Sequence, residues 1–503
     1  MSRFAVQLSI AIAAMAAGIA VCRGVEPTLP VAVPVPVPAK ADQLHGFVGT
    51  SSCTAAGCHG GNPAKSVVGS EHTVWLQHDM HAHAYNVLLN ETSQRMAKLL
   101  ELEKPAHESP LCLNCHGPVS EAPFPASIAG SHADLVTEGV SCEACHGAAS
   151  KWLGPHVRAD WKTKSVAQKA EFGYRDTKDF WQRAKLCADC HVGAPGRDVN
   201  HDLYAAGHPR LFFELSAFHS MMPTHWDRQT DRAKAAGVQQ AVKGAKVEKS
   251  PLEAQLWAIG QVASAEAALD LLIHRAKTSG ASTGRPEKYP SSQVVPAWPE
   301  LAETACFACH HDLASPSWRQ ARGYSNRKPG AAPWGTWLLP LVPNAAALGS
   351  GGISEKDGPL MALSHEMSKP LPDRQVAIGH AEALRTRLNL LGQEFNTKSL
   401  SADAVSAAFL KIVSEGGALS NKSWDEATQV YLSLVALNRA HRDMQGLADT
   451  ATSPCAETIS QLCELRDVLK FEPGFDSPLK YLKTPDANIE EKLKQIRGAF
   501  EAK

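Results

Sequence analysis

Residues 139–156 read GVSCEACHGAASKWLGPH, and the five letters CEACH within them decide how the rest of the chain is interpreted. Two residues separate the cysteines, and a histidine directly follows the second cysteine. The same pattern recurs as CLNCH at 112–116, CADCH at 187–191 and CFACH at 306–310. A pattern that recurs four times in one chain indicates a repeated chemical requirement rather than chance.

This spacing meets the requirement of covalent haem attachment. Two thiols add to the two vinyl groups on one porphyrin edge, and the next residue places an imidazole under the iron. Zinc ribbons also use paired cysteines, and exported proteins form disulfides, but neither needs a histidine at this position. The motifs therefore favour haem c. The predicted attachment and proximal residues are Cys112, Cys115 and His116; Cys142, Cys145 and His146; Cys187, Cys190 and His191; and Cys306, Cys309 and His310.

Residues 51–61, SSCTAAGCHGG, keep the same order with a longer loop. Cys53 and Cys58 are separated by four residues instead of two, and His59 follows the second cysteine. We predict a fifth haem here, because the histidine would have no role in a disulfide. Gly60 would leave the backbone free to approach a flat ring. A Cys53–Cys58 disulfide is the alternative.

The chain has 22 histidines, many more than five proximal ligands need. Low-spin electron-transfer haems use a second strong ligand on the far face of the iron, whereas an open face implies substrate chemistry. Spare histidines cluster near the motifs. The candidate distal ligands are His72, His81, His156, His201 and His208. The sequence alone does not pair them with particular haems.

Four stretches together resemble the multihaem cytochromes of the cytochrome c-554 and hydroxylamine oxidoreductase superfamily. They are SCTAAGCHGG, HDMHAHAYNVL, GVSCEACHGAASKWLGPH and NHDLYAAGHPRLFFEL, and residues 138–147 match the superfamily segment EGVxCExCHG. The resemblance covers residues 45–320. It implies closely stacked haems, mostly with two histidine ligands, in a largely helical shell with little sheet. It also implies that His81 and His156 are distal ligands.

This chain departs from the superfamily pattern in three respects. It has five predicted haem sites rather than eight, one of them with the longer CxxxxCH spacing, and it carries a long tail after the last motif. The smaller number of sites argues against transferring hydroxylamine or tetrathionate chemistry to this chain.

Composition bounds the remaining possibilities. The chain has 503 residues, of which 44% are hydrophobic, so it can bury a sizeable core. A net charge of -1 gives no electrostatic footprint for nucleic acid.

The first residues predict export. Arg3 precedes the apolar run FAVQLSIAIAAMAAGIAV, as in a signal peptide, and an uncleaved N-terminal membrane anchor is the alternative. Cys22 invites a lipoprotein interpretation, although Val21 is a poor residue before a lipidation site. We therefore expect a periplasmic or otherwise exported protein, with or without a membrane tether.

The predicted fold is mainly α, a multihaem cytochrome c fold with little sheet and a C-terminal helical region. The predicted boundaries are 1–24 for the signal peptide or anchor, 25–44 for a proline-rich linker, 45–320 for the haem domain, 321–365 for a Gly/Pro-rich connection and 366–503 for the helical region.

Two helix starts carry capping-box patterns, at Ser250 and at Ser423, each with a glutamate three residues later. In the C-terminal region, Cys455 and Cys463 can form a disulfide only if the segment between them is not one continuous helix.

Two functions follow from a set of covalent haems. The first is an electron-transfer cytochrome that passes electrons between redox partner proteins. The alternative is an oxidoreductase that acts on a small nitrogen or sulfur compound at one five-coordinate haem, with polar groups nearby. Counted along the chain, CxxxxCH is the first motif, CLNCH the second, CEACH the third, CADCH the fourth and CFACH the fifth. Candidate polar groups around the fourth motif are Asp202, Tyr204, Arg210 and His225.

Overall fold

The computed structural model describes residues 46–118, 133–238, 246–279, 297–304, 331–354, 358–420, 423–447, 456–469 and 486–501. These residues are mainly helical and form no sheet, with only isolated β-bridges, so the predicted α class is confirmed. The N-terminal segment, the CFACH motif and Cys455 lie outside the described residues.

Short helices and 3-10 turns fill the first part of the described chain. They are η2 Thr50–Cys53, α2 Glu71–His78, η3 Met80–His83, η4 Asn86–Leu89, α3 Glu91–Leu99, α4 Pro110–His116, α6 Ala133–Val136, α7 Cys142–His146, η5 Pro155–Val157, η6 Ala159–Thr163, α8 Val166–Ala170, α9 Phe180–His191 and α10 His201–Ala206. The hydrophobic clusters among these elements are small.

The later helices are mostly longer. They are α11 Leu215–Met221, α12 Arg228–Ala235, α13 Leu252–Thr278, α15 Val342–Ala346, α16 Pro359–Met367, α17 Arg374–Thr397, α18 Ala402–Ser420, α19 Trp424–Gln445, α20 Ala456–Leu469 and α21 Asp486–Glu501.

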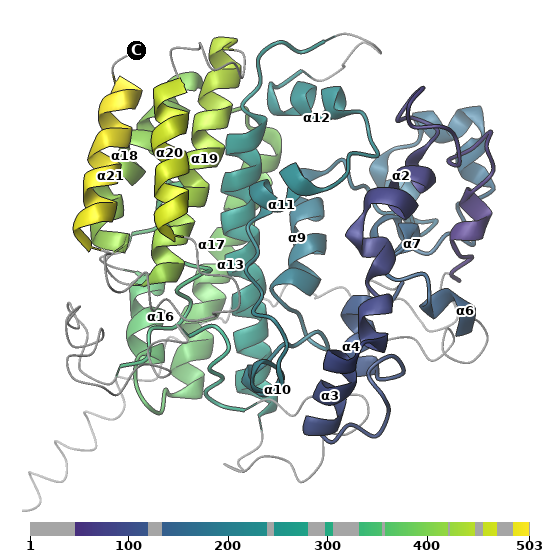
Figure 1. Ribbon diagram of the computed structural model, residues 1–503, viewed down its shortest axis with the longest axis horizontal. Helices are drawn as coiled ribbons and strands as arrows, with labels where there is room; N and C mark the ends of the chain where they lie inside the picture. The colour runs from purple at the N-terminus through teal and green to yellow at the C-terminus, as the bar shows by residue number, and fades with distance from the viewer. Residues whose placement is uncertain are drawn as a thin grey trace, which may run out of the picture. The chain divides into compact units, whose positions relative to one another are not determined.

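Helix α13 is the centre of the main hydrophobic core. It packs against α9 and α11 on one side and against α17 and α19 on another (Figure 1). Trp257 is fully buried, and its Nε1 donates a hydrogen bond of 2.7 Å to Ser433 of α19. The helix is long and apolar enough to cross a membrane, but 89% of its apolar window is buried inside the protein, as in the core helix of a globular fold.

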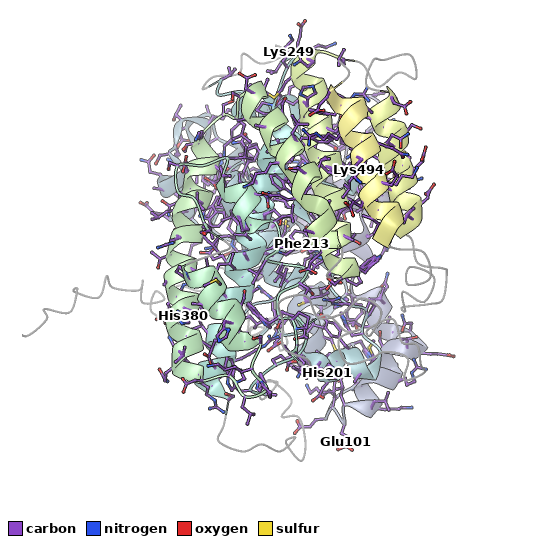
Figure 2. The ribbon with its side chains drawn as sticks, turned by 90° about the vertical axis from the view of Figure 1, so that its left-hand side faces the viewer. Glu101, His201, Phe213, Lys249, His380 and Lys494 are labelled. Carbon is purple, nitrogen blue, oxygen red and sulfur yellow. The ribbon has the colours of Figure 1, made fainter. Side chains whose placement is uncertain are left out.

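One hydrophobic cluster joins the fourth haem motif to the C-terminal helices. It includes Phe180 and Trp181 of α9 together with side chains of α13 and α17 to α21. Phe213, at the centre of Figure 2, is 3% exposed and belongs to the same cluster. The predicted division into a haem domain at 45–320 and a helical region at 366–503 stays a prediction. Described helices from both of these ranges contribute side chains to this one core.

The two capping predictions have different outcomes. Ser423 caps α19, since its hydroxyl accepts a hydrogen bond of 3.2 Å from the Glu426 backbone. The prediction at Ser250 is wrong: α13 begins after Pro251 without a side-chain cap, and the Ser250 hydroxyl donates instead to the carbonyl of Arg232. The Ser250 hydroxyl therefore bonds to α12 and not to the first turn of α13, as the local sequence pattern had predicted.

Helices α9 and α17 approach closely at a glycine. A Cβ on Gly392 of α17 would lie 2.4 Å from the ring of Trp181 in α9. One turn later, the side chain of Asn396 accepts from the backbone of Phe180 and donates to Asp179, at the start of α9. Helix α17 therefore fixes the position of the helix that carries the fourth motif.

We predict that Gly392→Ala lowers the free energy of unfolding by about 1–3 kcal/mol, because the added methyl overlaps the Trp181 ring. Gly379→Ala, in the same helix but at an exposed position with open space around it, is the matched control and should raise stability by about 0.5–1 kcal/mol. Chemical denaturation measures both. Equal effects of the two substitutions would contradict the close approach.

Candidate haem sites

Each of the three regular motifs that the structure describes is the end of a helix. Helix α4 ends at His116, α7 at His146 and α9 at His191. Residues three and four apart lie on the same face of a helix, so the second cysteine and the histidine of each motif share a face with the first cysteine. Local helical structure is thus sufficient to present two thiols and one imidazole to a single flat ring.

In the CxxxxCH motif, a turn instead of a helix brings the second cysteine and the histidine back toward the first cysteine. The 3-10 helix η2 ends at Cys53, and the backbone N–H of His59 then donates to the carbonyl of Cys53 at 3.3 Å. A Cβ on Gly60 would lie 1.9 Å from the Thr54 carbonyl. Gly60 is therefore needed for the tight closure of this loop, and its role in the approach to a flat ring stays a prediction.

The disulfide alternative is not formed in the structure, where Cys53 and Cys58 are both free. Instead, the thiol of Cys142 donates to Cys53, which lowers the pKa of Cys53 to about 7. In the same way Cys115 donates to Cys190 and lowers its pKa. The motifs therefore approach one another in pairs, the first with the third and the second with the fourth.

A set of histidines has one ring nitrogen already engaged. Nδ1 is hydrogen-bonded to a carboxylate or a backbone carbonyl in each, which leaves Nε2 for another partner. Metal-binding histidines typically make this contact, because it fixes the tautomer and the ring orientation. The contacts are His59 with Glu71 at 2.8 Å, His81 with Asp79 at 2.9 Å, His116 with the Ala84 carbonyl at 2.8 Å, His208 with the Pro209 carbonyl at 2.7 Å, and His156 with the Leu153 carbonyl.

Two predicted distal ligands lie close to two predicted proximal ligands. The ring centroids of His59 and His156 are 6.3 Å apart, and their planes differ by 16°. Those of His81 and His191 are 6.0 Å apart, with an interplanar angle of 81°. Neither pair is close in sequence, so the fold brings each together.

The proximal histidines of the third and fourth motifs are kept neutral. Burial, with smaller contributions from the neighbouring His225 and His59, lowers the pKa of His146 to about 4. Burial likewise lowers the pKa of His191 to about 4, with His81 and His116 nearby. A neutral imidazole is the form that binds a metal.

The remaining predicted ligands are less uniformly placed. His208 is close enough to His116 for charge repulsion to add to burial in lowering its pKa. His72 packs its ring against Trp75, with 5.6 Å between centroids, and is not in either histidine pair. His201 begins α10, and its backbone N–H donates to the carboxylate of Glu300 at 3.0 Å. Cys306, Cys309 and His310 lie outside the described residues.

Among the polar residues named for the oxidoreductase alternative, Arg210 is committed to a structural contact. Arg210 makes a bidentate ion pair with Asp425 at the start of α19, with both distances 2.8 Å. Tyr204 lies 6.4 Å from the ring of His208, and burial raises the pKa of its phenol. Asp202 is in α10. The Arg210 pair ties the segment after His208 to the C-terminal helices.

Sequence reasoning did not identify Arg197 as a site residue. Its side chain is 2% exposed and lies between the second and fourth motifs, where Nε donates to the Asn114 carbonyl at 2.8 Å and Nη1 is 3.6 Å from Asp189. Asn114 in turn donates to the Gly196 carbonyl at 2.7 Å. A buried positive charge between two motifs is a feature that only the tertiary structure reveals.

Comparison with known proteins identifies part of this region. Residues 53–147 match the family described as cytochrome c554 and c-prime. The match supports a c-type cytochrome. It implies haem c as the cofactor and electron transfer as the class of function. No curated protein and no solved structure matches the chain significantly.

The matched range includes the first three cytochrome motifs, among them the unusual CxxxxCH. The residues present fit haem c: thiols and imidazole share a helix face in the regular motifs, the pKa values of His146 and His191 are lowered, which favours neutral imidazoles, and two pairs of histidine rings lie 6.3 and 6.0 Å apart.

We predict that Asp425→Asn lowers the free energy of unfolding by about 3–5 kcal/mol, because it leaves the mostly buried Arg210 without its counter-charge. Asp270→Asn is the matched control. It breaks an ion pair with Arg385 whose side chains are 40% and 37% exposed, so the expected loss is below about 1 kcal/mol. Denaturant titration measures the free energy of unfolding of both variants. If Asp270→Asn is as destabilised as Asp425→Asn, the ion pair between Arg210 and Asp425 has no special structural role.

Proposed function

We propose that this chain is an exported, periplasmic multihaem c-type cytochrome that carries electrons through five covalently bound haems, mostly with two histidine ligands. Four haems attach at the CxxCH motifs and one at the CxxxxCH motif. The family match supports the cytochrome class, whereas the number of haems, their ligands and the location are part of the proposal.

The opposed histidine pairs are the observation that carries the proposal. A metal–imidazole bond of about 2 Å, added to the distance from the nitrogen to the ring centre, puts two ligands on opposite faces of one metal roughly 6 Å apart. The pair His59 and His156, at 6.3 Å, fits this separation, as does the pair His81 and His191, at 6.0 Å. We infer that each pair holds one iron.

Two further histidines can be assigned as the second axial ligands of two other motifs. His208 lies near His116 and has Nδ1 engaged by a carbonyl, so we assign it to the second motif. Glu300 accepts hydrogen bonds from the backbones of His201, Leu301 and Ala302, which brings the start of α10 next to the segment that leads to Cys306. We therefore assign His201 to the fifth motif.

The haem iron supplies the reversible one-electron change when it is bound. The residues of this chain hold the ligands in orientation, through Asp79, Glu71 and backbone carbonyls. Cys53 lies near Cys142 and Cys115 lies near Cys190, so haems attached at these cysteines would have edges close to one another, as electron transfer between them requires.

The oxidoreductase alternative requires an iron with one open face and a polar group free to act on a substrate. Arg210, one of its candidate groups, is paired with Asp425. The opposed histidines favour electron transfer for the first and fourth motifs. The partners we expect are a redox donor protein and a redox acceptor protein, with no role for nucleic acid.

Intact-mass measurement of the purified holoprotein tests the haem count. We expect five covalent haems in the wild type and loss or destabilisation of one haem in Cys53→Ser, because one of the two thioether bonds at the CxxxxCH motif is removed. Cys463→Ser, outside any motif, is the control and should keep all five. A wild-type count of four would contradict the site at Cys53.

Electron paramagnetic resonance (EPR) of the oxidised protein distinguishes electron transfer from substrate chemistry. We expect low-spin signals that do not shift on addition of nitrite, hydroxylamine or cyanide, because both faces of each iron carry a protein ligand. A high-spin signal that shifts with any of these compounds would favour the oxidoreductase alternative.

A further inference from the structure

The segment that supplies His156 carries charge of mostly one sign. Residues 148–170 contain five basic residues and one acidic residue, hence a net charge of +4 in a chain whose total is -1. We propose that the basic residues form a docking surface for a redox partner protein with an acidic surface, beside the haem that His59 and His156 would hold. This inference rests on the haem function proposed above. The residues of this basic surface are Lys151, Arg158, Lys162, Lys164 and Lys169.

The segment folds as one compact unit, so its basic residues are close in space as well as in sequence. Trp152 and Trp161 are both buried, and each packs edge-on against Tyr174, with 5.5 and 5.7 Å between ring centres. Nζ of Lys169 lies 5.9 Å from the Trp161 ring centre, a cation–π contact. The backbone N–H of Lys164 donates to the Trp161 carbonyl at 3.3 Å. The lysines therefore surround a shared hydrophobic cluster.

His156 belongs to the same unit. Its backbone N–H donates to the carbonyl of Trp152 at 2.9 Å, and its ring is 5.5 Å from the indole. The ring of His59 lies 6.3 Å from it. Lys151 comes five residues before His156 in the sequence, and Arg158 comes two residues after it. The basic surface therefore borders the site of the proposed first haem.

The charges of this surface are largely open to solvent. Lys151, Arg158 and Lys162 are exposed. Within the described ranges, no carboxylate lies within 4 Å of these three side chains, whereas Lys164 pairs with Asp160 at 3.2 Å. At least three positive charges are thus uncompensated at close range and can act on an approaching partner.

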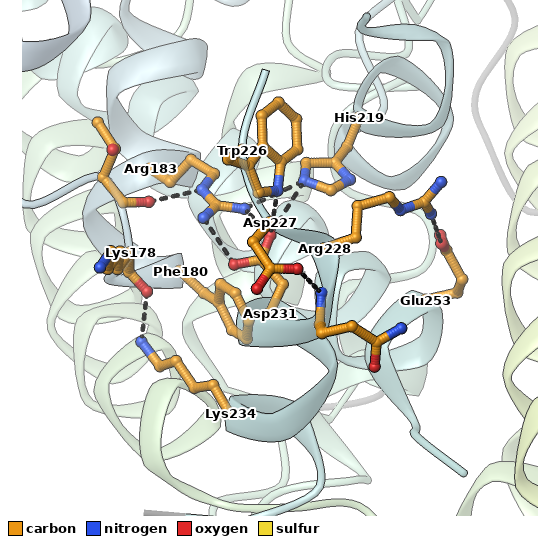
Figure 3. A network of polar contacts seen from close by, with 12 residues as sticks. Lys178, Phe180, Arg183, His219, Trp226, Asp227, Arg228, Asp231, Lys234 and Glu253 are labelled. Atoms are coloured by element: carbon orange, nitrogen blue, oxygen red, sulfur yellow. Dashed lines mark hydrogen bonds and ion pairs between the residues drawn. The ribbon is translucent and has the colours of Figure 1, made fainter. Parts of the chain in front are cut away.

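Another group of basic side chains in the haem region shows the contrast (Figure 3). Arg183 donates from its two terminal nitrogens to the carboxylate of Asp231, at 2.8 and 3.0 Å. Arg228 lies 3.6 Å from Glu253. A cation that is paired with a carboxylate contributes little net field at a distance. Charge that can steer a partner is therefore expected around His156 and not at this network.

Exposed apolar side chains accompany the basic residues. Val157, which directly follows His156, is 72% exposed, and Val166 is 56% exposed. The side chain of His59 is 41% exposed, so the proposed first haem lies near the protein surface. Protein interfaces combine apolar contacts at the centre with polar and charged residues at the rim. Complementary charge raises the rate of encounter, which suits a partner that must bind and leave quickly.

An anionic membrane would also attract a basic surface, but the apolar residues favour a protein. Segments that lie in a membrane interface insert large side chains such as Trp, Phe and Leu. Here Trp152 and Trp161 are buried, and Leu153 is partly buried against them. The large apolar side chains of this segment thus face inward, and the exposed ones are the two valines. We therefore assign the basic surface to an acidic redox protein.

Two small oxidants of opposite charge test whether electrons leave through this surface. Ferricyanide is an anion and hexaammineruthenium(III) is a cation, and each accepts one electron as one haem iron(II) becomes iron(III), without a proton or another reactant. In stopped-flow oxidation of the reduced holoprotein at low salt, ferricyanide should oxidise the surface variant about tenfold more slowly than the wild type. Hexaammineruthenium(III) should oxidise it faster, and both differences should largely vanish at about 1 M salt. The surface variant is Lys151→Gln/Arg158→Gln/Lys162→Gln.

A control variant separates the position of the charges from their number. It removes three positive charges from exposed positions elsewhere in the chain, none of which has a carboxylate within 4 Å in the part of the chain that the structure describes. Both variants should keep the wild-type haem count by intact mass and the low-spin EPR signals. Equal ferricyanide rates in the two variants would overturn the docking surface. The control is Lys246→Gln/Lys249→Gln/Arg387→Gln.

Two larger probes distinguish a protein partner from a membrane. Dye-labelled poly-L-glutamate represents an acidic protein surface, and vesicles of phosphatidylglycerol and phosphatidylcholine represent an anionic membrane. At low salt we expect the wild type to bind poly-L-glutamate at least about tenfold more tightly than the surface variant does, and this polymer should slow the oxidation by ferricyanide. Vesicle binding that persists at a salt concentration where poly-L-glutamate no longer binds would overturn the protein partner in favour of a membrane.

The failure of this inference differs from the failure of the proposed function. A wild-type protein that carries no covalent haem by mass would overturn the proposed function and, with it, the docking surface. A wild-type protein with its haems in place, whose oxidation by ferricyanide is equally fast in the surface variant, would overturn only the docking surface.

Discussion

A covalent haem motif supplies two thiols and one imidazole from a few consecutive residues, but the opposite face of the iron must be served from elsewhere in the chain. This requirement explains much of the fold. His156 comes from a 3-10 turn to face His59, and His81 comes from another 3-10 turn to face His191 at the end of α9. This region consists of short helices and turns around small hydrophobic clusters. Short elements of this kind can present histidines from distant parts of the chain to the same site.

The long C-terminal helices provide the rigidity that the short elements lack. Helix α17 holds α9 through Gly392 and Asn396, and α19 holds the segment after His208 through Asp425 and Arg210. These contacts connect helices without any cysteine motif to the elements that carry ligands. We infer that the C-terminal helices act as a scaffold, which sets the positions of the fourth motif and of His208, and hence the ligand geometry on which redox potentials depend.

Sequence predicts what is local and does not predict what depends on tertiary contacts. The proximal residues were predicted from motif spacing, whereas the helical shell of the haem region and the distal ligands His81 and His156 were predicted from a family resemblance; the α class is confirmed and the ligands stay predictions. The pairings were not predictable, because His81 and His191 meet only after α9 has packed on α13 and α17. Ser250 was misassigned for the same reason, since its hydroxyl bonds to α12.

The surroundings of His225 and Arg197 show the same limit. His225 was identified only as a polar group near the fourth motif, and its surroundings depend on Trp226 and on the ion pair between Asp231 and Arg183. Arg197 gave no sequence signal, since a single arginine after a motif is ordinary until it is found buried between two of them. A histidine-rich segment does indicate where distal ligands are to be sought, and the hydrogen bond at Nδ1 then distinguishes a fixed ring from a mobile one.

The most direct test of the central claim is an experimental electron-density or cryo-EM map of the oxidised holoprotein. The account predicts that His59 and His156 bind opposite faces of one iron with nearly parallel rings, and that His81 and His191 bind another iron with nearly perpendicular rings. A map in which the iron bound by His59 or by His191 carries water, or a different residue, on its second face would contradict it.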